Sequence, residues 1–284
     1  MYDNNLRENI GIGKLPRIGE KAAKPISCQP ILPHLDYKIL QGFFVSDWTL
    51  LCDFDGTISV EDTTDTLLER FGKPGWEVLE TDWREGRIGS RDCMAGQVAL
   101  LDMDKIELDA HLEARAMDPA FGDFVRSALA QGMHIEILSD GLDYAIRSIL
   151  ARNALDDLPV TANHLVPIGE REWRLTFPNA SATCSAASGT CKCARAARFQ
   201  DATTAGRKKR VLMIGDGASD FCVAAAADFV FAKGKLIDHC RAHNIPHAPI
   251  ADFADALALL PALVSGKLVA APRTLAAMPR AISA

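Results

Sequence analysis

Short apolar runs alternate with amphipathic segments from residue 49 onward. Apolar runs such as TLLCDF, MHIEILSD, RVLMIGDG and DFVFAK are separated by helix-like segments such as LDYAIRSILARN and KLIDHCRAHN. Apolar strands that alternate with amphipathic helices are typical of a parallel sheet covered by helices on both faces. We therefore predict an α/β fold with a Rossmann-like parallel sheet flanked by helices.

Three of these apolar runs end in a polar residue. The runs and their polar residues are Leu50–Cys52 with Asp53, Ile135–Leu138 with Ser139, and Val211–Gly215 with Asp216. A single D-x-D-G-T segment after a strand could equally be a turn or a helix cap, because Asp, Gly and Thr are common there. Ligands of open α/β sheets bind beyond the carboxyl ends of the strands, so three such segments are expected to converge on one crevice.

The polar segments are DFDGT at residues 53–57, SDG at 139–141, a later lysine, and GDGASD at 215–220. In this order they resemble the motifs of the haloacid dehalogenase superfamily of phosphohydrolases, over roughly residues 48 to 265. Three segments are similar to the branch of this superfamily that includes phosphoserine phosphatase and a methionine-salvage phosphatase. They are SDGLDYAI, the adjacent Cys191 and Lys192, and the segment from DFVFAK to ADFADAL. The methionine-salvage phosphatase is the closer likeness. The resemblance implies hydrolysis of a small phosphorylated metabolite, with a methylthiopentenyl phosphate as the first candidate substrate and phosphoserine as the second.

The two carboxylates of DFDGT can take two different roles in phosphate ester hydrolysis, one as nucleophile and the other as general acid and base. Asp53 is the candidate nucleophile, which would form an aspartyl-phosphate and split one difficult hydrolysis into two transfers. Asp55 can protonate the leaving group and later accept a proton from the attacking water. Ser139 can donate a hydrogen bond to a phosphoryl oxygen, and Lys192 can neutralise its charge.

Carboxylates clustered beside a phosphate repel one another and the substrate, so a divalent cation is expected. Mg²⁺ prefers carboxylates, substrate oxygens and water. We assign the metal site to Asp53, the backbone carbonyl of Asp55, and Asp216, as the resemblance also implies. Asp220 is assigned to the same site, behind Asp216, as a supporting or water-mediated partner.

The lysine of the third motif is assigned by its position. Lys192 opens the helix-like segment KCARAARF, whereas Lys208 and Lys209 lie in GRKKR, which is typical of a solvated basic turn. We therefore select Lys192, although CKCAR departs from the family's more usual CK-Pro.

About seventy residues separate Thr57 from the strand that begins near Met133, which is more than a simple crossover needs. We predict that residues 60–132 form a small helical cap over the crevice, where it would exclude water and contact the substrate. The predicted core spans 46–59 and 133–265, with an extension at 1–45 and a tail at 266–284. The candidate substrate-binding residues are Thr57, Asp140, Gly141, Glu61, Asp62 and Arg91.

Composition and charge limit the classes of partner. The chain has 284 residues, of which 48% are hydrophobic and 24% charged, which is typical of a soluble globular protein. The formal net charge of −6 argues against broad electrostatic binding of nucleic acid. No apolar run reaches membrane-spanning length, and the N-terminal segment lacks the apolar stretch of a secretory signal. We predict a cytoplasmic protein without nucleic acid or membrane partners, and the oligomeric state stays open.

The eight cysteines are predicted to be reduced thiols rather than a disulfide framework. Cys184, Cys191 and Cys193, with His164 upstream, raise the question of zinc. Their spacings C-x6-C and C-x-C differ from the paired C-x2-C segments of common zinc sites, so thiols are the favoured interpretation.

Other functions compete with hydrolysis. A phosphate-binding module of the response-regulator type presents acidic residues and a lysine at the same sheet edge, but it needs no helical insertion and no second DG motif. A dehalogenase of the same superfamily would need neither Asp55 nor the metal site. A phosphotransferase shares every core residue named above, so the sequence leaves that alternative open.

Overall fold

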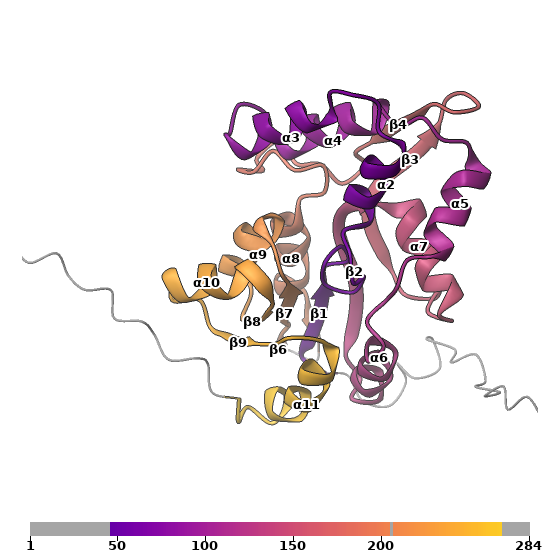
Figure 1. The fold of residues 1–284 in the computed structure, drawn as a ribbon. Helices are drawn as coiled ribbons and strands as arrows, with labels where there is room; N and C mark the ends of the chain where they lie inside the picture. The colour runs from indigo at the N-terminus through magenta and orange to yellow at the C-terminus, as the bar shows by residue number, and fades with distance from the viewer. Residues whose placement is uncertain (1–45, 205–206, 269–284) are drawn as a thin grey trace, which may run out of the picture. The chain divides into compact units, whose positions relative to one another are not determined.

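A seven-stranded sheet forms the centre of the protein in a computed structural model, which describes residues 46–204 and 207–268 (Figure 1). The predicted extension at 1–45 and most of the predicted tail at 266–284 lie outside the described residues. Neighbouring strands are parallel except for β3 and the edge strand β4, so the predicted α/β sheet is confirmed. In sheet order the strands are β4 (Trp173–Thr176), β3 (Val160–Pro167), β2 (His134–Leu142), β1 (Trp48–Cys52), β7 (Arg210–Gly215), β8 (Phe229–Ala232) and β9 (His247–Pro249).

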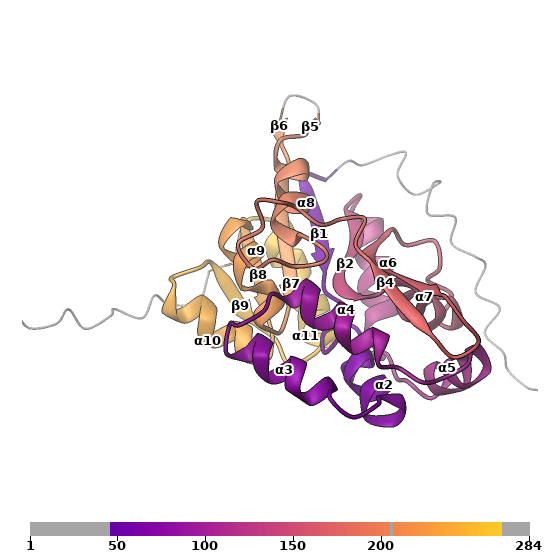
Figure 2. The same cartoon turned by 90° about the horizontal axis from the view of Figure 1, so that it is seen from above.

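Four helices between β1 and β2 form a cap beyond the carboxyl ends of the strands. They are α2 (Thr63–Phe71), α3 (Trp76–Arg84), α4 (Ser90–Ala99) and α5 (Lys105–Glu113). Figure 2 shows α3 and α4 side by side above the strands. Apolar cap residues such as Leu67 and Val98 are buried with Trp173 and Leu175 of β4, so the β3–β4 hairpin packs against the cap.

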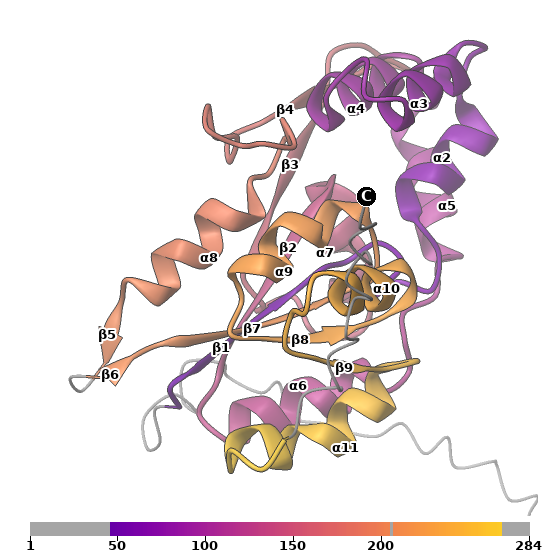
Figure 3. The same ribbon diagram turned by 90° about the vertical axis from the view of Figure 1, so that its left-hand side faces the viewer.

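Helices cover both faces of the sheet, because the apolar residues of each central strand alternate between two clusters. Leu50 and Cys52 belong to the cluster with α6 (Phe121–Ala130), α7 (Asp143–Arg152) and α11 (Phe253–Val264). Leu51 belongs to the cluster with α8 (Lys192–Gln200), α9 (Phe221–Ala226) and α10 (Gly234–Ala242). Figure 3 shows α6 and α11 on one side of the sheet and α8, α9 and α10 on the other. Smaller elements are the hairpin of β5 (Thr203–Thr204) and β6 (Arg207–Lys208), and the 3₁₀ turn η1 (Ala218–Asp220).

The helix α6 lies in the core rather than in the cap, although the sequence analysis includes it in the range 60–132. The rings of Phe121 and Phe124 lie 4.7 and 5.1 Å from the ring of Phe253 on α11. Both phenylalanines are buried against the sheet, so this part of the expected cap boundary is corrected. Within the part of the chain that the structure describes, no helix is both long and apolar enough to cross a membrane.

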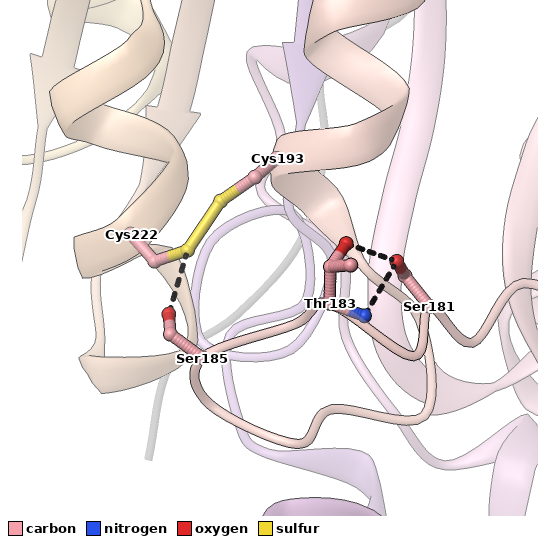
Figure 4. The surroundings of a disulfide bond; sticks show 5 residues. All are labelled: Ser181, Thr183, Ser185, Cys193 and Cys222. Carbon is pink, nitrogen blue, oxygen red and sulfur yellow. Dashed lines mark hydrogen bonds between the residues drawn. A yellow bond between two sulfur atoms is a disulfide. The ribbon is translucent and has the colours of Figure 1, made fainter.

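The cysteines depart from the expectation of reduced thiols at one pair. Cys193 of α8 and Cys222 of α9 form a disulfide, with their Cα atoms 6.5 Å apart (Figure 4). The two residues are 29 positions apart in the sequence, but α8 and α9 pack together on one face of the sheet. Cys52, Cys93, Cys184, Cys191 and Cys240 are free thiols, as expected.

Glu136 places a buried negative charge in β2. Both of its carboxylate oxygens accept hydrogen bonds of 2.7 Å from Arg195 of α8, and one of them accepts a hydrogen bond of 2.6 Å from Thr161. Burial alone would raise the pKa of Glu136, but hydrogen bonds from His134, Arg195 and Thr161 lower the pKa to about 2. The Glu136 carboxylate is therefore more strongly favoured over its protonated form in the folded state than in the unfolded chain.

We expect Glu136→Gln to lower the free energy of unfolding at pH 7 by about 2–3 kcal/mol. Because the folded pKa of about 2 lies below the ordinary value of 4.5, this stabilisation is present above pH 4.5 and is lost as the pH falls toward 2. Denaturant unfolding of wild type and Glu136→Gln at several pH values measures this difference in the free energy of unfolding. Glu113→Gln, at an exposed position of α5, is the control. Equal losses of stability on acidification in wild type and Glu136→Gln would contradict the assignment.

Candidate active site

The carboxyl ends of β1, β2 and β7 bring the candidate residues together, because these strands are parallel neighbours. A cavity of about 960 Å³ lies between the strand ends and the cap. Its wall on the core side includes Asp53, Asp55, Ser139, Asp140, Gly141 and Asp216. The structure thus places most of the candidates from the sequence around one space.

Lys192 lies at the centre of a buried charge cluster. Its Nζ lies 2.8 Å from an Asp53 oxygen and 2.6 Å from an Asp220 oxygen. Burial alone would lower the pKa of Lys192, but the charges of Asp220 and Asp53 outweigh it and raise the pKa above its ordinary value. Lys192 therefore carries a positive charge beside Asp53, whereas Lys208 lies exposed on β6.

Asp220 supports the site from behind. One oxygen binds Lys192, and the other accepts backbone hydrogen bonds from Asp216 at 3.1 Å and Gly217 at 3.4 Å. A Cβ atom on Gly215 would lie 2.2 Å from this second oxygen, so only glycine leaves room for Asp220 there. Because both oxygens are engaged, Asp220 is suited to hold the loop and Lys192 in place.

Asp53, Asp216 and Asp220 form an acidic cluster in which carboxylate oxygens lie within 4.8 Å of one another. Burial and the charge of Asp220 raise the pKa of Asp53, although Lys192 acts in the opposite direction. Burial also raises the pKa of Asp216, and this effect is partly offset by Thr57, whose hydroxyl donates to Asp216 at 2.8 Å. Crowded carboxylate oxygens of this kind fit a hard divalent cation such as Mg²⁺.

Asp55 is fixed between the cap and the SDG segment. Its Oδ1 accepts a hydrogen bond of 2.9 Å from the backbone N–H of Thr63, the first residue of α2. A Cβ atom on Gly141 would lie only 2.2 Å from its Oδ2, so the backbone of the SDG segment approaches Asp55 closely. Burial raises the pKa of Asp55, which favours the protonated form that a general acid needs.

The other two residues of the SDG segment have different environments. Ser139 lines the cavity, and its Oγ accepts a hydrogen bond of 2.9 Å from the backbone of Gly141, so its own hydroxyl proton can be donated to a ligand. The Asp140 carboxylate accepts hydrogen bonds from the Ser90 hydroxyl at 2.6 Å and from the Thr190 backbone at 2.8 Å. Asp140 therefore connects the core to the start of α4, and it also lines the cavity.

Three candidate substrate-binding residues, Thr57, Glu61 and Arg91, are not among the residues that line the cavity. Glu61 forms an ion pair of 2.9 Å with Arg115, and Arg91 lies 3.4 Å from Asp92, on exposed surfaces. The assignment of Glu61 and Arg91 to substrate binding stays a prediction that the cavity lining does not support. Asp62 does line the cavity, and it also caps α2 by accepting a hydrogen bond of 3.0 Å from the Asp65 backbone.

The cap contributes residues that the sequence analysis does not single out. They include Asp65, Glu80, Trp83, Arg84, Met94 and Gln97. Glu80, Trp83 and Arg84 follow the i, i+3, i+4 spacing of one helical face, so a helical projection would have grouped them. The spacing alone does not say whether that face points toward the crevice or toward solvent.

Comparisons with known proteins agree with this geometry. The curated 2-hydroxy-3-keto-5-methylthiopentenyl-1-phosphate phosphatase of Brevibacillus brevis is 30% identical over 214 residues, which cover 74% of this chain and 94% of that protein. The protein of the same name from Exiguobacterium sp. is 30% identical over 212 residues, 72% of this chain and 94% of that protein. A solved phosphoserine phosphatase with a phospho-aspartyl intermediate analogue superposes with a TM-score of 0.56 at 17% identity, covering 75% of this chain and 98% of that chain.

The likeness to the solved structure supports the fold, and the family match identifies the chain. The family described as haloacid dehalogenase-like hydrolase matches residues 50–225. This match includes the strand ends that carry Asp53, Ser139 and Asp216. The chain therefore belongs to the haloacid dehalogenase-like hydrolases.

Proposed function

We propose that the protein hydrolyses a small phosphomonoester through an aspartyl-phosphate formed on Asp53. The observation that carries the proposal is the position of the Asp53 carboxylate, which lines the cavity and lies 2.8 Å from the Lys192 ammonium group. The hydrolase family and the phosphatase names of the curated relatives support the same chemistry.

In the first half-reaction, an Asp53 oxygen attacks phosphorus and the bond from phosphorus to the leaving oxygen breaks. Asp55 donates its proton to that oxygen, consistent with a pKa that burial raises. Lys192 and the Ser139 hydroxyl stabilise the negative charge on the phosphoryl oxygens. The product alcohol then leaves, and the phosphoryl group stays on Asp53.

In the second half-reaction, a water molecule attacks the phosphoryl group. Asp55, now a carboxylate, accepts a proton from that water, and the bond from phosphorus to the Asp53 oxygen breaks. Inorganic phosphate leaves, and Asp53 and Asp55 return to their starting protonation states. Asp53, Asp216 and the backbone carbonyl of Asp55 would hold Mg²⁺, which neutralises charge on the phosphoryl group.

The first candidate substrate is 2-hydroxy-3-keto-5-methylthiopentenyl-1-phosphate, because the chain covers 94% of the Brevibacillus relative of that name. The cap side of the cavity supports this choice, since Trp83 and Met94 offer an aromatic ring and a thioether for contact with an apolar methylthio group. Phosphoserine is the second candidate. Acidic Asp62 and Asp65 could pair with its ammonium group, and Arg84 could pair with its carboxylate.

Activity with both compounds decides between the candidates. Arg84 is among the residues that line the cavity, whereas Arg91, another exposed arginine of the cap, is not. For the methylthiopentenyl ester, we expect Arg84→Ala and Arg91→Ala both to keep kcat/KM within about threefold of wild type, because this substrate has no carboxylate to pair. Efficient phosphoserine hydrolysis whose KM rises in Arg84→Ala alone would reverse the order of the candidates.

The same assays separate hydrolysis from phosphoryl transfer and test the metal. A hydrolase releases one inorganic phosphate for each ester consumed, with water as the only acceptor. Chelation by EDTA should stop turnover, and added Mg²⁺ should restore it. Ester consumption without an equal release of phosphate would favour a phosphotransferase instead.

We expect Gly141→Ala to lower kcat by about 100-fold, because the new Cβ atom would push Asp55 out of position. Gly122→Ala on α6 is the matched control, since its Cβ atom would meet only the end of the Arg126 side chain, at 3.4 Å. Thermal melting of both variants checks that the fold is kept. Wild-type kcat in Gly141→Ala would show that Asp55 tolerates displacement and is not the proton donor.

A further inference from the structure

A largely buried hydrogen-bond network holds the SDG segment. Its members are Ser90, the first residue of α4, Asp140 of the SDG segment, Asn163 of β3, and Thr190 in the loop before α8. The exposed fractions of Asp140, Asn163 and Thr190 are 7%, 0% and 1%. Buried polar groups are costly unless they have partners, and none of the four takes part in the chemical steps proposed above. What the four residues connect therefore indicates their role.

The sheet is irregular at the SDG segment. The pairing of β2 with β3 shifts its register between Leu138 and Leu142, so the segment lies in a bulge of β2. A bulge interrupts the regular ladder of hydrogen bonds and redirects the side chains that it contains. The side-chain amide of Asn163 donates a hydrogen bond to the backbone carbonyl of Asp140, within this bulge. Asn163 therefore supports the backbone beside Ser139 at a place where the strand ladder is interrupted.

Both oxygens of the Asp140 carboxylate accept hydrogen bonds. One oxygen accepts from the Asn163 amide at 3.0 Å and from the Thr190 backbone N–H at 2.8 Å. The other oxygen accepts from the Ser90 hydroxyl at 2.6 Å. The Thr190 hydroxyl donates to the side-chain oxygen of Asn163 at 3.0 Å, so these two residues are also joined directly. Buried networks whose groups have partners hold their members in one arrangement.

The network reaches the backbone beside both side chains that are expected to contact the phosphoryl group. Ser139 directly precedes Asp140, and Lys192 lies two residues after Thr190. Because the Thr190 backbone donates to Asp140, the segment that carries Ser139 is tied to the loop that leads to Lys192. Without this tie, the separation of the two side chains would depend on that loop. A displacement of about 1 Å in such groups can lower a rate by about 100-fold.

The same network binds the cap. Ser90 of α4 donates to Asp140, and the backbone N–H of the next residue, Arg91, donates at 3.1 Å to a carbonyl in the loop before α8. This carbonyl belongs to Ala187, and a Cβ atom on Gly89 would lie 2.6 Å from the Cβ atom of Ala187. Helix α4 also contributes cavity-lining residues of the cap. The position of α4 and the positions of the two phosphoryl-contacting side chains therefore depend on shared hydrogen bonds.

We propose that Asp140 is a positioning residue, which fixes Ser139 and Lys192 relative to each other and to the start of α4. The proposal rests on the proposed function, in which Ser139 and Lys192 stabilise charge on the phosphoryl oxygens. Asp140 acts through its three hydrogen-bond donors and not through contact with the substrate. The contacts to the phosphoryl group are then complete only when α4 is seated on the core.

The test measures kcat and KM for p-nitrophenyl phosphate with Mg²⁺, so that the result does not depend on which candidate substrate is correct. Asp140→Asn keeps the size of the side chain but places an NH₂ group among hydrogen-bond donors, so at least one hydrogen bond is lost. We expect kcat to fall by about 30-fold while KM stays within about threefold of wild type, because the displaced groups act in the transition state. Ser90→Ala removes the hydrogen bond to the cap alone, and we expect kcat to fall by about fivefold.

Amide hydrogen exchange gives a second readout that does not require turnover. We expect the peptide that contains Thr190 to exchange at least about threefold faster in Asp140→Asn than in wild type. The same increase is expected in Ser90→Ala, although the substituted residue lies in the cap, because Asp140 connects the two places. Thermal melting of both variants checks that the fold is kept.

Asp143→Asn is the matched control for both readouts. Asp143 also accepts a backbone hydrogen bond, from Leu165 at 3.0 Å, but it is not among the residues that line the cavity. Wild-type kcat in Asp140→Asn, or an equal loss of kcat in Asp143→Asn, would overturn the proposal. A raised KM with unchanged kcat would also overturn it, because that result would indicate direct contact with the substrate. Unchanged exchange in Ser90→Ala would refute the connection to the cap, whereas a wild-type protein that hydrolyses no phosphomonoester would contradict the proposed function.

Discussion

Asp53→Asn is expected to lower turnover by about four orders of magnitude or more and to abolish covalent phosphorylation of the protein. The substitution keeps the size of the side chain at the end of β1 but replaces a carboxylate with an amide that is a poor nucleophile. The fold should be kept, because removing one negative charge from the acidic cluster relieves repulsion with Asp216 and Asp220. Loss of activity without loss of stability therefore separates a chemical role from a structural one.

Two measurements test this prediction. Rapid quenching with a labelled phosphoester should trap a phosphoenzyme in wild type, and peptide mapping should place the label on Asp53. The control is Asp92→Asn, which makes the same chemical change on an exposed position of α4 and should leave both turnover and labelling intact. Near-normal turnover by Asp53→Asn, or a label on another carboxylate, would remove Asp53 from the nucleophile's role.

The parts of the fold that follow from local pattern were predictable from the sequence. Asp53, Ser139 and Asp216 each mark the point where a buried strand changes from apolar to polar residues, and parallel neighbours bring such points to one edge. The helix α2, from Thr63 to Phe71, lies in the predicted helical cap and follows from local signals, because Asp62 supplies the N-cap and Leu67 and Leu68 form an apolar face.

The parts that depend on distant partners were not predictable. The sequence shows that Phe121 and Phe124 share an apolar helical face, but their partner is Phe253, more than a hundred residues away, and so α6 was expected in the cap. Likewise, the charge of Glu61 and Arg91 is visible in the sequence, but the direction in which each side chain points depends on tertiary packing. In both cases the sequence shows which side chains are apolar or charged, but it does not show which distant residues they contact.

Lys192→Met is expected to lower kcat by about 100- to 1,000-fold, because it removes the positive charge that stabilises the phosphoryl group in the transition state. It should also destabilise the fold by about 3–5 kcal/mol, since Asp53 and Asp220 would remain buried without their common partner. Lys208→Met, at an exposed position of β6, should change neither quantity.

The double variant Lys192→Met/Asp220→Asn separates the two roles of Lys192. Removing the Asp220 charge as well should recover part of the lost stability, because one fewer carboxylate is left unpaired beside Asp53. It should not recover kcat, because no cation is restored next to the phosphoryl group. If turnover returned together with stability, Lys192 would be a structural partner of Asp220 and not a catalytic residue. If Lys208→Met were instead the inactive variant, the lysine of the third motif would be assigned to the wrong position.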